Sequence, residues 1–124
     1  AKVSETVCAL GDDFVTLSGD DGLTLPFMAC GAKGVISVAS NIIPSTVSQL
    51  AQFALQGDYG RARAIHLEHY QFFNDLFCEP NPVPVKTLLH LKGLISSAEV
   101  RLPLTPPSSQ NSELLGKIAE SLSL

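Results

Sequence analysis

The sequence lacks the cysteine pattern of a disulfide-stapled or zinc-binding protein. It has no Cys-x-x-Cys pair, and its three cysteines, Cys8, Cys30 and Cys78, are odd in number and far apart along the chain. Each stands among apolar residues, so we expect buried, small apolar side chains in a reducing compartment.

An excess of basic residues is also missing. Lys and Arg together number 8 against 12 Asp and Glu, which gives a formal net charge of -4. Such a chain has no basic surface for nucleic acid or anionic lipid. No apolar run approaches the roughly 18 residues of a membrane-spanning helix, and no signal-peptide pattern opens the sequence. We therefore expect a soluble, cytoplasmic protein with no nucleic-acid and no membrane partner.

What the sequence does contain is enough apolar residue to build one domain. The 124 residues are 45% hydrophobic, which excludes general disorder. Residues 1–11 read as the end of a helix, with Gly11 as its terminator and no cap before Ala1. We expect the chain to be a segment of a larger protein.

The stretch from 14 to 44 organises the rest of the chain. Residues 14–18 and 34–39 are β-branched, apolar runs that predict two buried strands, and a short amphipathic helix lies between them. A strand, a crossover helix and a second strand imply parallel pairing. Chemistry in parallel sheets gathers at the strand C-termini, which here carry Gly19-Asp20-Asp21-Gly22 and Ser40-Asn41.

Helices are predicted for most of the remainder. Prolines make residues 78–84 extended and residues 95–104 irregular. Capping residues and glycines bound the predicted helices, which are a helix from Pro44 ended by Gly57, a helix from Tyr59 to about Phe77 capped by Asp58, a helix over 85–91 ended by Gly93, and a helix from 113 to about 122 capped by Ser108 or Ser109.

The acidic turn after the first strand has two interpretations. Asp20 and Asp21 could supply carboxylates for acid–base or metal chemistry, but helix capping explains them more simply. Gly19 at the strand tip indicates a backbone that comes close to a ligand or to a neighbouring loop.

No complete catalytic set can be assembled from the other residues. His66 and His69 share a helix face without the spacing of zinc helices, so we expect a solvated or subunit-facing surface and no metal site. His90 stands alone among leucines as a packed or rim residue. No nucleophile has an evident base, and we expect the lysines to be solvated.

Five segments together resemble the dihydrodipicolinate (4-hydroxy-tetrahydrodipicolinate) synthase family, within the pyruvate-dependent aldolase and lyase superfamily. They are LSGDD at 17–21, GAKGVISVASN at 31–41, the Gly57-Asp58 corner with Ala62-Arg63, LFCEPNPVPVK at 76–86 and RLPLTP at 101–106. The resemblance covers essentially the whole chain, but only the C-terminal part of the family's fold.

The resemblance implies an α/β fold, the C-terminal portion of a TIM (β/α)8 barrel. Residues 1–56 would form the last βα units, with the two predicted strands as the seventh and eighth of the barrel. Residues 57–124 would form a C-terminal helical region.

The implied activity is condensation of pyruvate with aspartate semialdehyde through a lysine Schiff base, in lysine and diaminopimelate biosynthesis. The resemblance places the imine lysine and the proton-relay tyrosines upstream of Ala1, so Lys2 is not the imine lysine and no catalytic residue lies in this segment. It implies no cofactor, and it implies as partners the N-terminal part of the same barrel and further subunits of a homotetramer.

Three residues inherit a role from the resemblance. Ile36 would direct its main-chain carbonyl at bound pyruvate, Gly19 would line the same pocket with its backbone, and Asn81 would support the barrel mouth. Two alternatives stay open. The chain could be a non-catalytic fragment that oligomerises, or it could belong to a sialic or keto-deoxy sugar acid aldolase of the same superfamily.

Overall fold

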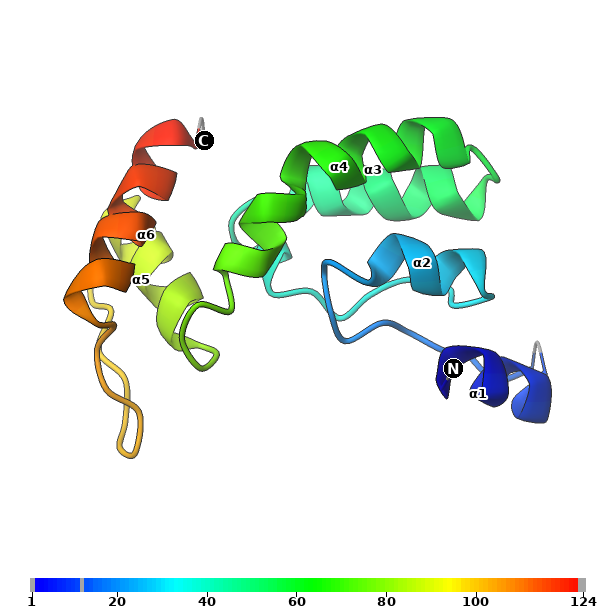
Figure 1. Cartoon of the computed structure of the whole chain (residues 1–124), viewed down its shortest axis with the longest axis horizontal. Helices are drawn as coiled ribbons and strands as arrows, with labels where there is room; N and C mark the ends of the chain where they lie inside the picture. The colour runs from blue at the N-terminus through cyan, green and yellow to red at the C-terminus, as the bar shows by residue number, and fades with distance from the viewer. Residues whose placement is uncertain (1, 12, 123–124) are drawn as a thin grey trace.

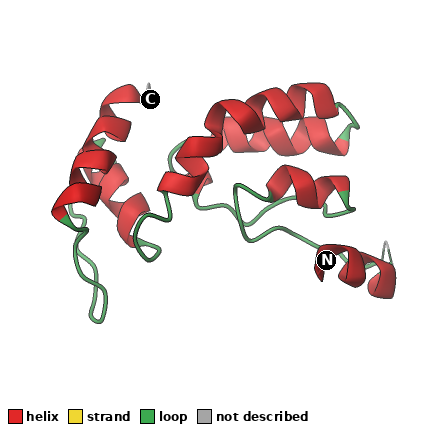
Figure 2. Cartoon of the chain, in the orientation of Figure 1, coloured by secondary structure: helices red, strands yellow, loops and turns green. Residues whose placement is uncertain are grey.

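The computed structural model describes residues 2–11 and 13–122, and it is mostly helical (Figures 1 and 2). Figure 1 shows α5 beside α6 at one end of an elongated molecule, α2, α3 and α4 in the middle, and α1 at the other end. The helices within these residues are α1 Lys2–Leu10, α2 Thr24–Ala29, the 3-10 helix η1 Ala39–Asn41, α3 Pro44–Leu55, α4 Tyr59–Asp75, α5 Val83–Leu91 and α6 Ser109–Ser121.

The two predicted strands meet in only one parallel β-bridge, between Ser18 and Val35. The Ser18 N–H donates to the Gly34 carbonyl and the Ile36 N–H donates to the Ser18 carbonyl, both at 2.8 Å. Parallel pairing is therefore present where we expected it. The expectation of two full strands is wrong for the described residues, which contain no strand (Figure 2).

A change of register limits the pairing. The next contact runs from the Lys33 N–H to the Thr16 carbonyl, at 2.8 Å. A ladder in register with the Ser18–Val35 bridge would use the N–H of Gly34 instead. The two segments also lack partners on their outer edges within the described chain, and a pair of strands by itself is too small to be a stable sheet.

Glycines end the helices at the predicted places. Gly11, Gly57 and Gly93 have positive φ angles of 66°, 79° and 70°, directly after the last turns of α1, α3 and α5. The left-handed conformation that these angles describe strains any residue with a Cβ.

Capping residues start α4 and α6 as expected. The Asp58 carboxylate accepts a hydrogen bond from the Arg61 N–H at 3.0 Å, and the Ser108 hydroxyl accepts one from the Asn111 N–H at 3.3 Å. Each bond satisfies one of the free N–H groups of a first helical turn.

Two helix starts differ from the prediction. Helix α5 begins at Val83 and includes Pro84, although the prolines of 78–84 predicted an extended segment throughout. Proline has no N–H to lose in a first turn and its φ angle already suits a helix, so Pro84 is tolerated there. Helix α6 begins at Ser109, four positions before the predicted residue 113, because Ser108 is its cap.

One apolar core runs through the described residues and joins α3 and α4 to α5 and α6. Leu50 of α3 and Leu76, at the end of α4, lie in the same cluster as Leu88 of α5 and Leu115 of α6, and each is at most 1% exposed. The cation of Arg61 lies 4.2 Å from the centre of the Phe53 ring and adds a contact between α3 and α4.

The prediction of buried cysteines is wrong for Cys8 and Cys30 and is met only in part by Cys78, which packs against the core. Cys8 and Cys30 are exposed and Cys78 is half-buried, and all three are free. Cys8 lies on α1, which buries none of its side chains, and Cys30 is the C-terminal cap of α2. None of the helices in the described ranges is long and apolar enough to cross a membrane.

Candidate functional site

Gly19, Ile36 and Asn81 line one open depression of about 510 Å³. Its walls come from the segment after the β-bridge, from η1 and from the start of α5. The residues that line it are Gly19, Ile36, Ser37, Val38, Asn41, Asn81, Pro82, Val85, Lys86 and Leu89. The structure thus brings together three residues that are up to 62 positions apart in the sequence (81 minus 19).

Gly19 has open space where a side chain would stand. A Cβ built on it would meet no atom within 4 Å, and its φ angle is not in the left-handed region. No neighbour among the described residues therefore requires glycine at this position. A larger side chain here would reduce the volume of the depression.

Ile36 is held by its backbone. Its side chain is 70% exposed, while its N–H donates to the Ser18 carbonyl at 2.8 Å. That bond orients the peptide group before Ile36, and the residues after Ile36 are held from the other side by Asp21.

Asp21 joins the ends of the two bridged segments. Its carboxylate accepts hydrogen bonds from the backbone N–H groups of Val38, at 2.9 Å, and Ala39, at 3.1 Å, and a short hydrogen bond from the Ser37 hydroxyl. Asp21 is only 2% exposed. The prediction that Asp21 caps the following helix is therefore wrong, because its carboxylate is turned toward the start of η1.

Asp20 does not cap α2 either, because Leu23 is the N-cap residue and α2 has no side-chain cap, so the role of Asp20 lies in the preceding turn. Its carboxylate accepts from the Leu23 N–H at 3.2 Å, in the turn that leads into α2. Two adjacent aspartates thus differ in their role, because Asp20 bonds within its own turn and Asp21 bonds to residues 37–39. Sequence reasoning missed the link between Asp21 and Ser37 since nothing local distinguishes one aspartate from the other.

Asn81 lies in a turn that α6 holds in place. The Glu79 carboxylate accepts from the Ser108 N–H at 3.0 Å and from the Asn111 amide at 2.8 Å, and that amide also donates to the Cys78 carbonyl at 3.1 Å. The same hydrogen bonds from Ser108 and Asn111 lower the pKa of Glu79. Asn81 itself is exposed at the rim of the depression.

The histidines form no metal site in the part of the chain that the structure describes. His69 Nδ1 lies 3.1 Å from the Ile65 carbonyl, and the His90 side chain is exposed, as a rim residue would be. His66 is not the solvated residue that was one of the two expectations for this helix face. Its ring packs near Tyr70 and Phe73, its Nδ1 is buried with no hydrogen-bond partner, and burial lowers its pKa.

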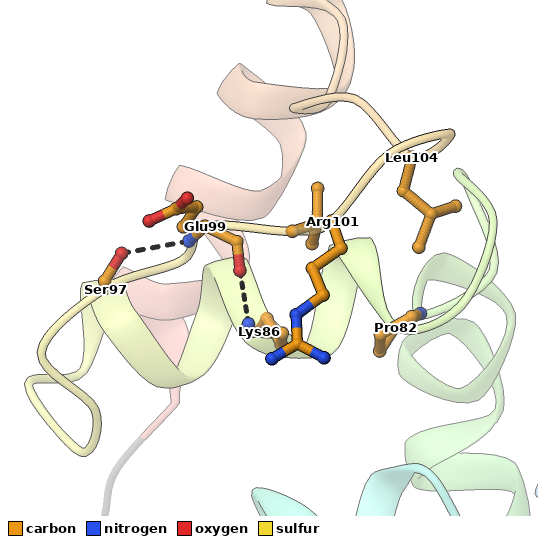
Figure 3. A pocket seen from close by; sticks show the side chains of 7 residues that line it. Pro82, Lys86, Ser97, Glu99, Arg101 and Leu104 are labelled. Carbon is orange, nitrogen blue, oxygen red and sulfur yellow. Dashed lines mark hydrogen bonds between the residues drawn. The ribbon is translucent and has the colours of Figure 1, made fainter.

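A second, larger pocket of about 620 Å³ adjoins the depression (Figure 3). It lies between α5 and the loop before α6, and it shares Pro82 and Lys86 with the depression. Its other lining residues are Ser97, Glu99, Val100, Arg101 and Leu104. Sequence reasoning did not identify this pocket.

The depression can bind a small molecule but carries little reactive chemistry of its own. Lys86 is the one ionisable side chain among its lining residues, and the Lys86 Nζ donates to the backbone carbonyl of Glu99. Among the described residues, therefore, these walls offer backbone groups, amides and one positive charge, without a paired acid and base.

Comparison with known proteins identifies the family of this chain. The Dihydrodipicolinate synthetase family matches residues 1–122. The 4-hydroxy-tetrahydrodipicolinate synthase of Sulfurihydrogenibium sp. (strain YO3AOP1) is 51% identical over all 124 residues, and that of Aquifex aeolicus (strain VF5) is 49% identical over 123 residues. The chain spans about 42% of the length of both relatives.

Solved structures give the same result. The crystal structure of dihydrodipicolinate synthase from Aquifex aeolicus is 50% identical to the chain, with a TM-score of 0.91 over 95% of this chain and 40% of that one. The synthase structure from Methylacidiphilum fumariolicum SolV is 51% identical, with a TM-score of 0.91 over 97% of this chain and 39% of that one.

The described fold therefore matches part of a TIM-barrel enzyme, although it is mostly helical itself. The family match extends over nearly the whole chain, and the fold and the sequence agree on it. This chain belongs to the dihydrodipicolinate synthetase family.

Proposed function

We propose that the chain forms the C-terminal portion of a TIM (β/α)8 barrel. In this proposal residues 1–56 are its last βα units and residues 57–124 are its C-terminal helical region. The parallel bridge between Ser18 and Val35 supports this assignment, because adjacent barrel strands pair in parallel. The rest of the barrel would provide the missing strand partners on both edges.

The proposed activity is condensation of pyruvate with aspartate semialdehyde, to which this chain contributes part of the site. The main observation that supports this activity is that Gly19, Ile36 and Asn81 line one depression. Here Gly19 and the Ile36 carbonyl would form one wall of the pyruvate site, and Asn81 would support its mouth. The imine lysine and the proton-relay tyrosines would come from the N-terminal part of the barrel.

Two general considerations support a divided site. A Schiff base needs an amine that is deprotonated by dry surroundings, and the depression here is open and has only Lys86 at its edge. Binding walls and reacting groups in TIM barrels come from different βα loops at one face. The whole assembly would be a cytoplasmic homotetramer.

Coexpression with the N-terminal part of a close relative tests the proposal. Borohydride reduction in the presence of pyruvate should trap an imine, and peptide mapping should locate it on the N-terminal part and on none of this chain's lysines. An assembled pair of chains that traps no pyruvate would refute the proposal.

A matched pair of variants tests the wall itself. Gly19→Leu should fill the depression and raise the pyruvate concentration needed for half-maximal trapping by about tenfold. Gly116→Leu is the control, since Gly116 lies on α6 and a Cβ there also meets no atom within 4 Å. If the two variants have equal effects on trapping, Gly19 is not part of the pyruvate site.

The alternative, a self-associating fragment, is favoured by one observation. Phe14, Val15, Leu17 and Leu23 lie in or shortly after the first bridged segment, and each is more than 40% exposed. A second copy could cover this apolar face instead of the rest of a barrel. Light scattering combined with a pyruvate-binding measurement separates the two cases, because a homo-oligomer of this chain that excludes the N-terminal part and binds no pyruvate supports the alternative.

A further inference from the structure

The pocket between α5 and the loop before α6 has two positive side chains on its walls. Lys86 comes from the second turn of α5, and Arg101 comes from the loop (Figure 3). This pocket is separate from the proposed pyruvate wall, since Gly19, Ile36 and Asn81 are absent from its lining.

Lys86 is held in place by the loop. Its Nζ donates a hydrogen bond to the backbone carbonyl of Glu99, and the Glu99 N–H in turn donates to the Ser97 hydroxyl at 3.0 Å. A neutral carbonyl orients the ammonium group but does not neutralise it. The bond to Glu99 uses one N–H donor of the Lys86 ammonium group, which leaves two further donors for a ligand.

Arg101 also lacks an acidic partner among the described residues, whose ion pairs are Arg61 with Asp58 and Lys117 with Glu113. In Figure 3 the Arg101 guanidinium points into the pocket on the side of Lys86, while the Glu99 carboxylate points away from both cations. Two like charges that face one pocket repel each other, and an anion between them would convert that repulsion into attraction.

The lining also indicates which anion fits. Lys86, Arg101 and Glu99 together carry a net charge of +1, which suits a monovalent anion better than a divalent one. The guanidinium fork matches the two oxygens of a carboxylate. Val100 and Leu104 add an apolar wall that suits a short alkyl group.

We propose that the pocket lined by Lys86, Arg101, Ser97 and Leu104 binds a small organic monocarboxylate. Arg101 contacts both carboxylate oxygens, Lys86 contacts one of them, and the alkyl group lies against Leu104. This inference rests on the pocket alone and does not depend on the proposed synthase activity.

The test is a titration of the full 124-residue chain, labelled with ¹⁵N, with sodium propionate at constant ionic strength. Backbone amide signals of residues 97–101 should shift and saturate, whereas those of Gly19 and Ile36 should not. Arg101→Gln and Lys86→Gln should each weaken the affinity by about tenfold, and Arg101→Lys should weaken it less.

Lys117→Gln is the matched control, because it removes one positive charge from the exposed surface of α6 and should leave the affinity unchanged. If Lys86→Gln disturbs the fold, the affinity of Arg101→Gln for propionate is the test of the proposal. The proposal is overturned if the shifts do not saturate, or if Lys117→Gln lowers the affinity for propionate as much as the pocket variants do. It is also overturned if inorganic phosphate binds as tightly as propionate.

Discussion

Asp21 shows how a single buried carboxylate can fix the shape of a site. It holds the backbone at Val38 and Ala39, just after Ile36, and it receives the Ser37 hydroxyl. A buried carboxylate is costly unless hydrogen bonds replace its lost hydration, and three donors do so here.

Replacing Asp21 should therefore destabilise the chain. Asp21→Asn keeps the size of the side chain but replaces one acceptor oxygen by an amide that cannot accept from a backbone N–H. We expect the free energy of unfolding to fall by about 1.5–3 kcal/mol, the usual worth of hydrogen bonds to a charged group. Urea unfolding measures this free energy, and Asp13→Asn is the control because Asp13 is exposed. Equal effects would contradict a special role for Asp21.

His66 should give the chain a pH dependence near neutrality. Burial lowers its pKa below the ordinary value of 6.5, so the unfolded chain binds a proton more readily than the folded one. The stabilising contribution is complete above pH 6.5 and is lost as the pH falls toward the lowered pKa. Asp58 and Glu79 also have lowered pKa values, but their ordinary values of 3.8 and 4.5 place their effects at lower pH.

The midpoint of thermal unfolding should thus decrease between about pH 7.5 and about pH 5.5. His66→Phe should reduce that decrease, since the ring stays among Tyr70 and Phe73 without a titrating group. His90→Gln should leave the decrease unchanged, because His90 is exposed. The interpretation is wrong if the two variants behave alike.

Among the elements, helices were predicted better than strands. The ends of α1, α3, α4 and α5 follow from glycines and from Asp58, which act on the nearest turn. The predicted strands need a partner on each edge, and the apolar pattern of 14–18 and 34–39 says nothing about whether that partner is in the chain. Within the described residues only the Ser18–Val35 bridge forms.

The start of α6 depends on Ser108. Ser108→Ala removes the acceptor for the Asn111 N–H, and we expect a loss of about 1 kcal/mol in the free energy of unfolding. Ser109→Ala is the control, because Ser109 is the first residue of α6 and is exposed. Helix content and unfolding by circular dichroism would show the difference, and a larger loss at Ser109 would identify that residue as the cap.

On the scale of the whole molecule, the apolar residues are divided between a shared core and an exposed face. Leu50, Leu76, Leu88 and Leu115 unite the two groups of helices, while Phe14, Val15, Leu17 and Leu23 remain in contact with solvent. A face of this kind is typical of an interaction surface.

That face should bind an apolar dye when the chain is alone. Phe14→Ser should lower the fluorescence of bound ANS, and addition of the N-terminal part of a relative should lower it further. Leu102→Ser is the control: Leu102 is 88% exposed but belongs to the loop before α6. If Leu102→Ser removes as much dye as Phe14→Ser, the 14–23 face is not the binding surface.

The sequence by itself determined the family, most helix ends and the parallel direction of the one β-bridge, because each depends on a motif or on contacts within a turn. Tertiary structure decided that Gly19, Ile36 and Asn81 share one depression, that Asp21 binds Ser37 while Asp20 bonds within its own turn, and that Lys86 and Arg101 line one pocket. These arrangements join residues that are distant along the chain. Their geometry depends on how the helices pack, which no local pattern records.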